Sequence, residues 1–231
     1  MAGKLGLVTI GQSPRSDYET IYKHHAPDSE ILWAGALDGF TQSEARELEA
    51  KGDSYPLHTG LADGTKLAIS LEVLLPLVEK RAGDLARDGA DLIILLCAGG
   101  FPEFECPAPV LLPGNVMPNV ARTLTKRGRV GVVTPIPGQI EPARKKWTED
   151  GFDVEVVAGS PDNDEETRQA AKELATQDLE LIVLDCMGHH SGHQREVAEI
   201  SGRPVIVAQN VVARIAGEYM SGVPKQVRTG V

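Results

Sequence analysis

Residues 91–100 read DLIILLCAGG, and residues 180–189 read ELIVLDCMGH. The two segments match position by position: an acidic residue, Leu-Ile, an apolar pair, a variable residue, Cys, another variable residue and Gly. A short continuous apolar run of this kind is typical of a strand that is buried on both faces of a parallel sheet. The repeat therefore predicts that Cys97 and Cys186 end equivalent strands of two related units.

Two further blocks recur in the same order on either side of the cysteine segments. GKLGLVT at residues 3–9 corresponds to GRVGVVT at 128–134, and PVLL at 109–112 corresponds to PVIV at 204–207. Solenoid repeats have periods of roughly 20–50 residues, and the interval between these copies is longer. A duplicated half-molecule explains the pattern better than a repeat array.

Apolar segments alternate with helical ones along most of the chain. In the second half, strands are expected at 130–134, 153–157, 181–185 and 205–208, and helices at 138–150, 164–177, 192–200 and 211–221. In the first half, strands are expected at 5–10, 30–36, 92–96 and 110–112, helices after Pro14 and at 43–51 and 71–88, and a hairpin at 54–59 with 65–69. This alternation predicts an α/β fold whose parallel sheets are covered by helices on both faces.

Composition excludes several classes of partner. The net charge is −10, and no cluster of Lys and Arg suits a phosphate backbone, so nucleic acid is not an expected partner. No segment has the ~18 consecutive apolar residues of a membrane span, and the apolar run at 5–10 is too short for a signal peptide. The three cysteines, an odd number, are expected to be free thiols, so we expect a cytoplasmic protein.

The ends of the predicted strands locate the candidate site, because ligands of open parallel sheets bind outside the carboxyl ends of the strands. An arginine there can grip a carboxylate through two parallel hydrogen bonds, and glycines leave N–H groups free to bind an anion. A histidine beside a cysteine can polarise the thiol or bind a carboxylate. The residues that we expect to bind substrate on these grounds are Gln12, Ser13, Arg15, Gly99, Gly100, Thr134, Gly188 and His189.

Other interpretations of these residues remain open at this point. A cysteine at a strand end is often a small buried apolar side chain, and Arg15 is as compatible with an ordinary surface position. Cys106, in a proline-rich loop, has no counterpart in the other half. His190 and His193 are compatible with solvated loop positions, and the spacing of these histidines from Cys186 does not match a paired Cys-x-x-Cys zinc site, so no metal is expected.

The motifs resemble a known family. Two halves that each carry a cysteine at a strand end resemble the aspartate/glutamate racemase superfamily, and LVTIGQSPRSD, LLCAGGF, GVVTP and LDCMGHH with AQNVVARIA resemble more narrowly the AroM family. The resemblance implies two pseudo-symmetric flavodoxin-like domains with an active-site cleft between them. It places residues 1–113 plus 209–231 in the first domain and residues 114–208 in the second.

The resemblance also implies a reaction. Cys97 and Cys186 would transfer a proton at the α-carbon of a small carboxylic acid, as in a racemase or isomerase that needs no cofactor. The racemases follow their cysteines with Asn-Thr and Thr-His, whereas Ala98-Gly99 and Met187-Gly188 stand here. The alternatives are a decarboxylase or cis–trans isomerase of a diacid, or a non-catalytic small-molecule-binding protein on the same scaffold. By analogy with enzymes of this build, a homodimer is expected.

Overall fold

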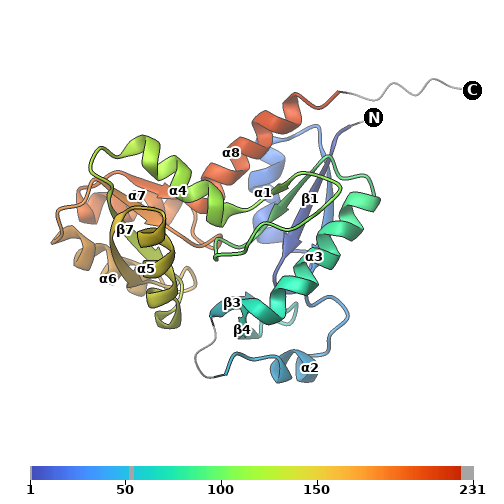
Figure 1. Cartoon of the computed structure of the whole chain (residues 1–231), viewed down its shortest axis with the longest axis horizontal. Helices are drawn as coiled ribbons and strands as arrows, with labels where there is room; N and C mark the ends of the chain where they lie inside the picture. Colours follow the sequence, from blue (N-terminus) through green and yellow to red (C-terminus); the bar gives the residue numbers. More distant parts are fainter. Residues whose placement is uncertain (1, 52–54, 225–231) are drawn as a thin grey trace, which may run out of the picture.

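Two parallel four-stranded sheets form the framework of the computed structural model, which describes residues 2–51 and 55–224 (Figure 1). The first sheet has the order β2 (Glu30–Gly35), β1 (Lys4–Thr9), β5 (Leu92–Leu95) and β6 (Val110–Leu111). The second has the order β8 (Asp153–Ala158), β7 (Arg129–Thr134), β9 (Leu181–Leu184) and β10 (Val205–Val207). The orders are equivalent strand by strand, which confirms the predicted α/β fold with two pseudo-symmetric parallel sheets.

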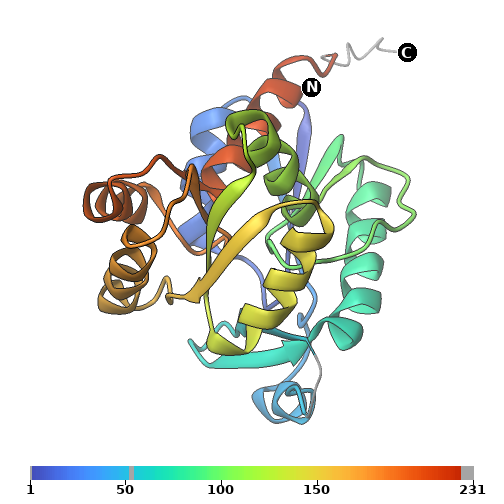
Figure 2. The same ribbon diagram turned by 60° about the vertical axis from the view of Figure 1, so that its left-hand side comes forward.

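Helices cover both faces of each sheet. The outer face of the first sheet packs on α3 (Leu71–Arg87), and that of the second packs on α6 (Asp164–Ala175) and α7 (Ser191–Ser201). Figures 1 and 2 show α3 on one side of the molecule and α6 and α7 on the other. The core cluster shared by the two sheets includes side chains of α1 (Ser16–His25), α4 (Pro113–Leu124), α5 (Ile140–Glu149) and α8 (Ala208–Ser221). This shared core fixes the strand ends of one half relative to those of the other.

The helices that follow β6 and β10 contact the opposite halves. The helix α4 continues from the first sheet but contacts β9 of the second, and α8 continues from the second sheet but contacts α1 and β5 of the first. The two helices also contact each other. The domain boundaries given above stay a prediction, and their residues 1 and 225–231 lie outside the described part of the chain.

A small antiparallel hairpin belongs to the first half and reaches the second. Its strands are β3 (Pro56–Gly60) and β4 (Lys66–Ser70), so the predicted hairpin is confirmed with each strand ending one residue later than expected, and residue 54 of that prediction is not described. The carbonyl of Gly60 accepts a hydrogen bond of 3.1 Å from the N–H of Gln12, and that of Pro56 accepts one of 2.9 Å from Gln139 Nε2. The hairpin therefore bridges the end of β1 and the loop after β7.

One helix was not expected from the sequence. The helix α4 begins at Pro113 and carries Pro118 in its interior, and an interior proline normally predicts a helix end. Here Pro113 suits the first turn, and Met117 and Ala121 are fully buried in the shared core, so apolar burial outweighs the lost hydrogen bond. The helix predicted at 138–150 begins with a short 3₁₀ turn, η1 (Pro137–Gln139), which is followed by α5. The helix predicted at 43–51 is α2, which spans Gln42–Glu47. Over the described residues, no helix is long and apolar enough to cross a membrane.

Candidate active site

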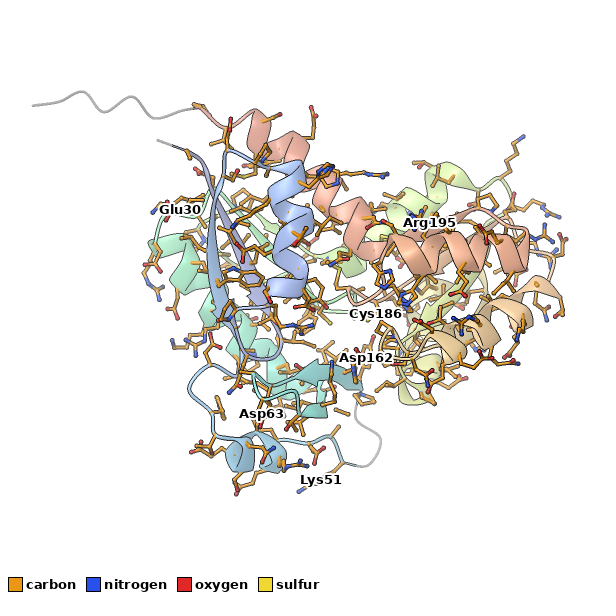
Figure 3. All side chains as sticks on the ribbon, turned by 180° about the vertical axis from the view of Figure 1, so that it is seen from behind. Glu30, Lys51, Asp63, Asp162, Cys186 and Arg195 are labelled. Carbon is orange, nitrogen blue, oxygen red and sulfur yellow. The ribbon has the colours of Figure 1, made fainter. Side chains whose placement is uncertain are left out.

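A small cavity of about 60 Å³ lies between the two halves, at the carboxyl ends of the strands. Both Cys97, which follows β5, and Cys186, which follows β9, line it. Figure 3 shows Cys186 and Asp162 where the second half faces the first. The cavity lining also includes Thr9, Ile10, Arg15, Tyr18, His58, Thr59, Gly60, Lys66, Leu96, Ala98, Gly99, Pro135, Gln139, Pro161, Asp162, Asp185, Met187 and Gly188.

The two cysteine turns share one local geometry. The N–H of Gly99 donates to Cys97 Sγ at 3.4 Å, and the N–H of Gly188 donates to Cys186 Sγ at 3.5 Å. A Cβ atom at Gly99 would lie 2.7 Å from Leu57 Cδ2, and one at Gly188 would lie 2.8 Å from the Pro161 ring. The repeated Cys-x-Gly pattern thus encodes a turn in which glycine allows close packing while its N–H faces the sulfur.

Burial keeps both thiols protonated near neutral pH. It raises the pKa of Cys97 to about 12 and that of Cys186 to about 11, because a thiolate loses its hydration in the closed site. The glycine N–H groups oppose this rise in each thiol pKa, whereas the nearby Asp185 carboxylate adds to it. A negative charge on either sulfur therefore needs a compensating positive charge close by.

Positive side chains approach the cavity from the first half. Arg15 lines it while its guanidinium pairs with Asp17, with Nε–Oδ1 and Nη2–Oδ2 distances of 2.9 and 2.6 Å. Asp162 of the second half lies 3.0 Å from Lys66 Nζ and 3.3 Å from His58 Nε2 of the hairpin. These contacts depress the pKa of Asp162 despite its partial burial. One carboxylate of the second half thus contacts a lysine and a histidine of the first.

A second carboxylate, Asp185, lies between the cysteines and the interior of the second half. Its Oδ2 accepts a hydrogen bond of 3.0 Å from Trp147 Nε1 and lies 3.6 Å from Lys146 Nζ. Within the described part of the chain, Asp185 Oδ1 and Lys146 Nζ are buried and have no hydrogen-bond partner. A buried polar group without a partner inside a cavity wall is a candidate for contact with a ligand or for a role in the chemistry.

The structure brings five of the ten predicted site residues to this cavity: Cys97, Cys186, Arg15, Gly99 and Gly188. Gln12 and Ser13 instead stabilise the loop after β1. Gln12 Nε2 donates to two backbone carbonyls and its Oε1 accepts a backbone N–H, while Ser13 Oγ donates to Asp38 at 2.7 Å. Their polar groups are occupied within the protein, so the placement at the cavity predicted for them is corrected.

Gly100 and Thr134 also lie outside the cavity lining. The N–H of Gly100 donates to the Tyr55 hydroxyl at 3.4 Å. The Thr134 hydroxyl is buried within hydrogen-bonding distance of the carbonyls of Ile136 and Val157. Gly100 follows β5 and Thr134 is the last residue of β7, but each polar group already has a partner in the protein.

His189 was also predicted to bind substrate, but it lies outside the cavity lining. Its side chain is fully buried and does not line the cavity, and its Nδ1 lies 3.2 Å from Nδ1 of His193, which in turn contacts Asp164. Burial lowers the pKa of His189 to about 3, so the imidazole is neutral. His190 caps α7 by accepting the N–H groups of Gly192 and His193. Among the described residues, no group of three or more His, Cys, Asp or Glu side chains could hold a metal ion.

The sequence did not predict the cavity residues that come from outside the repeated blocks. Thr59, His58 and Lys66 come from the hairpin, whose position between the halves has no sequence signal. Asp162, which follows β8, lies outside the repeated blocks. So does Lys146 on α5, which pairs with Asp185 but is not part of the cavity lining. For Asp185 the signal was present, because it directly precedes Cys186.

Comparisons with known proteins agree with this architecture. A family model described as AroM protein matches residues 5–220. No curated protein matches the chain in sequence. The maleate isomerase Iso from Pseudomonas putida S16 has 16% identity and a TM-score of 0.63, covering 99% of this chain and 96% of its own.

Two other enzymes share the fold. The glutamate racemase from Aquifex pyrophilus has 14% identity and a TM-score of 0.59, covering 94% of this chain and 83% of its own. Unliganded arylmalonate decarboxylase has 15% identity and a TM-score of 0.58, covering 99% and 96%. At these identities the likeness establishes a common fold.

Proposed function

The chain belongs to the AroM family, and from this premise we propose that it is a cofactor-independent enzyme that uses two cysteines to move a proton at the α-carbon of a small carboxylic acid. The observation that carries the proposal is that Cys97 and Cys186 line one cavity in equivalent turns. The racemase, isomerase and decarboxylase that share the fold are consistent with this general chemistry.

In the proposed reaction the two sulfurs act in turn. One cysteine, as thiolate, removes the α-proton, and the other, as thiol, delivers a proton to the opposite face of the same carbon. The electron pair of the broken C–H bond stays on the α-carbon as a carbanion conjugated with the carboxylate until the second proton arrives. A cavity of about 60 Å³ suits a small acid.

The substrate carboxylate is expected to bind at the hairpin side of the cavity. The Thr59 hydroxyl is buried, lines the cavity and has no hydrogen-bond partner among residues 2–51 and 55–224. Lys66 and His58 lie beside it and already hold one carboxylate, that of Asp162. A substrate carboxylate can bind the Thr59 hydroxyl and share or replace Asp162 as the partner of Lys66 and His58, with Arg15 on the adjacent loop.

Solvent deuterium exchange tests the proposal. A panel of small mono- and dicarboxylic acids is incubated with the enzyme in D2O, and loss of the α-proton signal is followed by NMR. We expect exchange with at least one acid, lost in Cys97→Ser and in Cys186→Ser and retained in Cys106→Ser, the matched control because Cys106 lies outside the cavity. Full exchange in both cavity variants would refute the two-thiol reaction.

A second candidate function, decarboxylation of a diacid, is favoured by the protonated state of both thiols. Loss of CO2 leaves the electron pair of the C–C bond on the α-carbon, and a neutral thiol then donates the proton, so no thiolate has to form first. The thiol regains its proton from solvent. Release of CO2 from a malonate-type acid, with one cysteine essential and the other dispensable, would distinguish this reaction from racemisation.

A further inference from the structure

Lys146 and Asp185 form a buried ion pair next to the two cysteines, and the proposed reaction gives this pair no role. The side chains of Lys146 and Asp185 are 16% and 4% exposed, and Nζ lies 3.6 Å from Oδ2. All three Nζ donors and Asp185 Oδ1 lack a hydrogen bond, whereas Oδ2 accepts one from Trp147 Nε1. Buried ion pairs are usually completed by further hydrogen bonds, so this incomplete pair needs an explanation.

The two members of the pair reach the two cysteines differently. Asp185 directly precedes Cys186 and lines the cavity. Lys146, on α5, lies against the other turn, since a Cβ atom at Gly100 would be 3.9 Å from Lys146 Cδ. The titratable and charged groups that act on the two sulfurs from the surrounding elements are Arg15, Tyr18, Tyr55, Lys146, Asp162 and Asp185, together with the partner thiol.

We propose that Lys146 is a positioning residue that controls thiolate formation at Cys97, by opposing the negative charge of Asp185 and by keeping that carboxylate turned toward Trp147. The inference rests on the proposed function, because it assigns a role to the pair within a two-thiol site. Asp185 opposes a negative charge on either sulfur, and Lys146 favours it at Cys97. Lys146 lies beside Gly100 in the turn that follows Cys97, so we expect its effect to be larger at Cys97 than at Cys186.

The rate of iodoacetamide alkylation tests the inference without a substrate, because the thiolate is the reacting form. Rates at Cys97 and Cys186 are measured by peptide mass spectrometry between pH 7.5 and 10.5. The proteins compared are the wild type, Lys146→Met, Lys146→Arg, Asp185→Asn and the double variant Lys146→Met/Asp185→Asn. Circular dichroism at each pH confirms that every variant is folded.

We expect Lys146→Met to slow alkylation of Cys97 by about three- to tenfold, a shift of roughly half to one pH unit, and to change Cys186 less. Lys146→Arg should restore the wild-type profile. Asp185→Asn should accelerate both cysteines, because it removes the negative charge that acts on both. The double variant should return Cys97 close to the wild-type rate, because the unopposed carboxylate is then absent.

Two results would overturn the inference. One is an unchanged Cys97 profile in folded Lys146→Met, since a packing role is retained by the methionine side chain. The other is a double variant as slow as Lys146→Met, which would mean that Lys146 does not act through Asp185. If Lys146→Met does not fold, the comparison of Asp185→Asn with wild type decides. Equal alkylation rates of Cys97 in these two proteins would refute the inference, because Asp185 would then have no effect for Lys146 to oppose. Absence of deuterium exchange would refute the proposed reaction, but it would not change the alkylation rates, which are measured without a substrate.

Discussion

Acid pH should destabilise the protein through His189. Burial lowers the pKa of this imidazole to about 3, and the adjacent His193 adds to the effect. The unfolded chain binds a proton at the ordinary histidine pKa of about 6.5, whereas the folded chain does not until the pH is far lower. The contribution of His189 to stability is therefore complete above pH 6.5 and is lost as the pH falls toward 3.

The magnitude follows from the two pKa values. Each pH unit between them costs at most about 1.4 kcal/mol, so lowering the pH from 7 to 5 should remove about 2 kcal/mol from the free energy of unfolding through His189. For a chain of this size that corresponds to a fall of about 4–8 °C in Tm. Most carboxylates with a lowered pKa, such as Asp178 and Glu180, contribute at more acid pH.

Urea unfolding followed by circular dichroism between pH 5 and 7.5 measures this effect. We compare the slope of unfolding free energy against pH in the wild type and in His189→Asn, with His24→Asn, at an exposed position on α1, as a control for loss of one imidazole. The wild-type slope should exceed that of His189→Asn by about 1 kcal/mol per pH unit. Parallel profiles for wild type and His189→Asn would refute the assignment of His189 as a buried neutral histidine.

Three further predictions concern the cavity and the core. Native Cys97 and Cys186 should react with iodoacetamide at pH 8 on the order of a hundredfold or more slowly than in urea-unfolded protein, because the raised pKa of each thiol suppresses the thiolate; peptide mass spectrometry measures the ratio, and equal rates contradict it. Trp147→Phe should cost about 2–3 kcal/mol in urea unfolding, since it removes the only hydrogen bond that the Asp185 carboxylate makes with the described residues, and less in an Asp185→Asn background. Met117→Ala should cost about 2–5 kcal/mol in the same assay, because the side chain is fully buried in the core shared by the two sheets; a cost below 1 kcal/mol would contradict that packing.

The sequence was sufficient to predict the framework because the framework is repeated. Three of the four strands of each sheet lie in the repeated blocks, and the edge strands β2 and β8 do not. In one half the cysteine follows β5, which neighbours β1, and in the other it follows β9, which neighbours β7. The continuous apolar character of β5 and β9 indicated strands buried on both faces. The helix α4 was missed because two prolines and a glycine near its start are read locally as a loop, whereas its stability comes from burial against the opposite half.

The site was predicted less completely, because the rule used to locate it considers only where strands end. The strand-end rule selects positions along each strand, and three of the residues predicted with it, Arg15, Gly99 and Gly188, line the cavity. Their role in substrate binding stays a prediction. It does not say which polar groups already have partners within the protein, as those of Gln12 and Thr134 do. Nor does it identify residues such as Lys66, which a hairpin brings to the cavity from outside the repeated blocks.

The differences between the two thiol turns matter as much as their equivalence. A two-thiol proton transfer requires one sulfur to lose its proton while the other keeps it, and different surroundings decide which of the two sulfurs loses it. The backbone turns and their glycine N–H donors are equivalent, but the surroundings are not: Lys146 and Tyr55 act on Cys97, whereas Arg15 and Asp162 act on Cys186. Duplication therefore accounts for the paired thiols, and the residues outside the repeat give each thiol its own electrostatic surroundings.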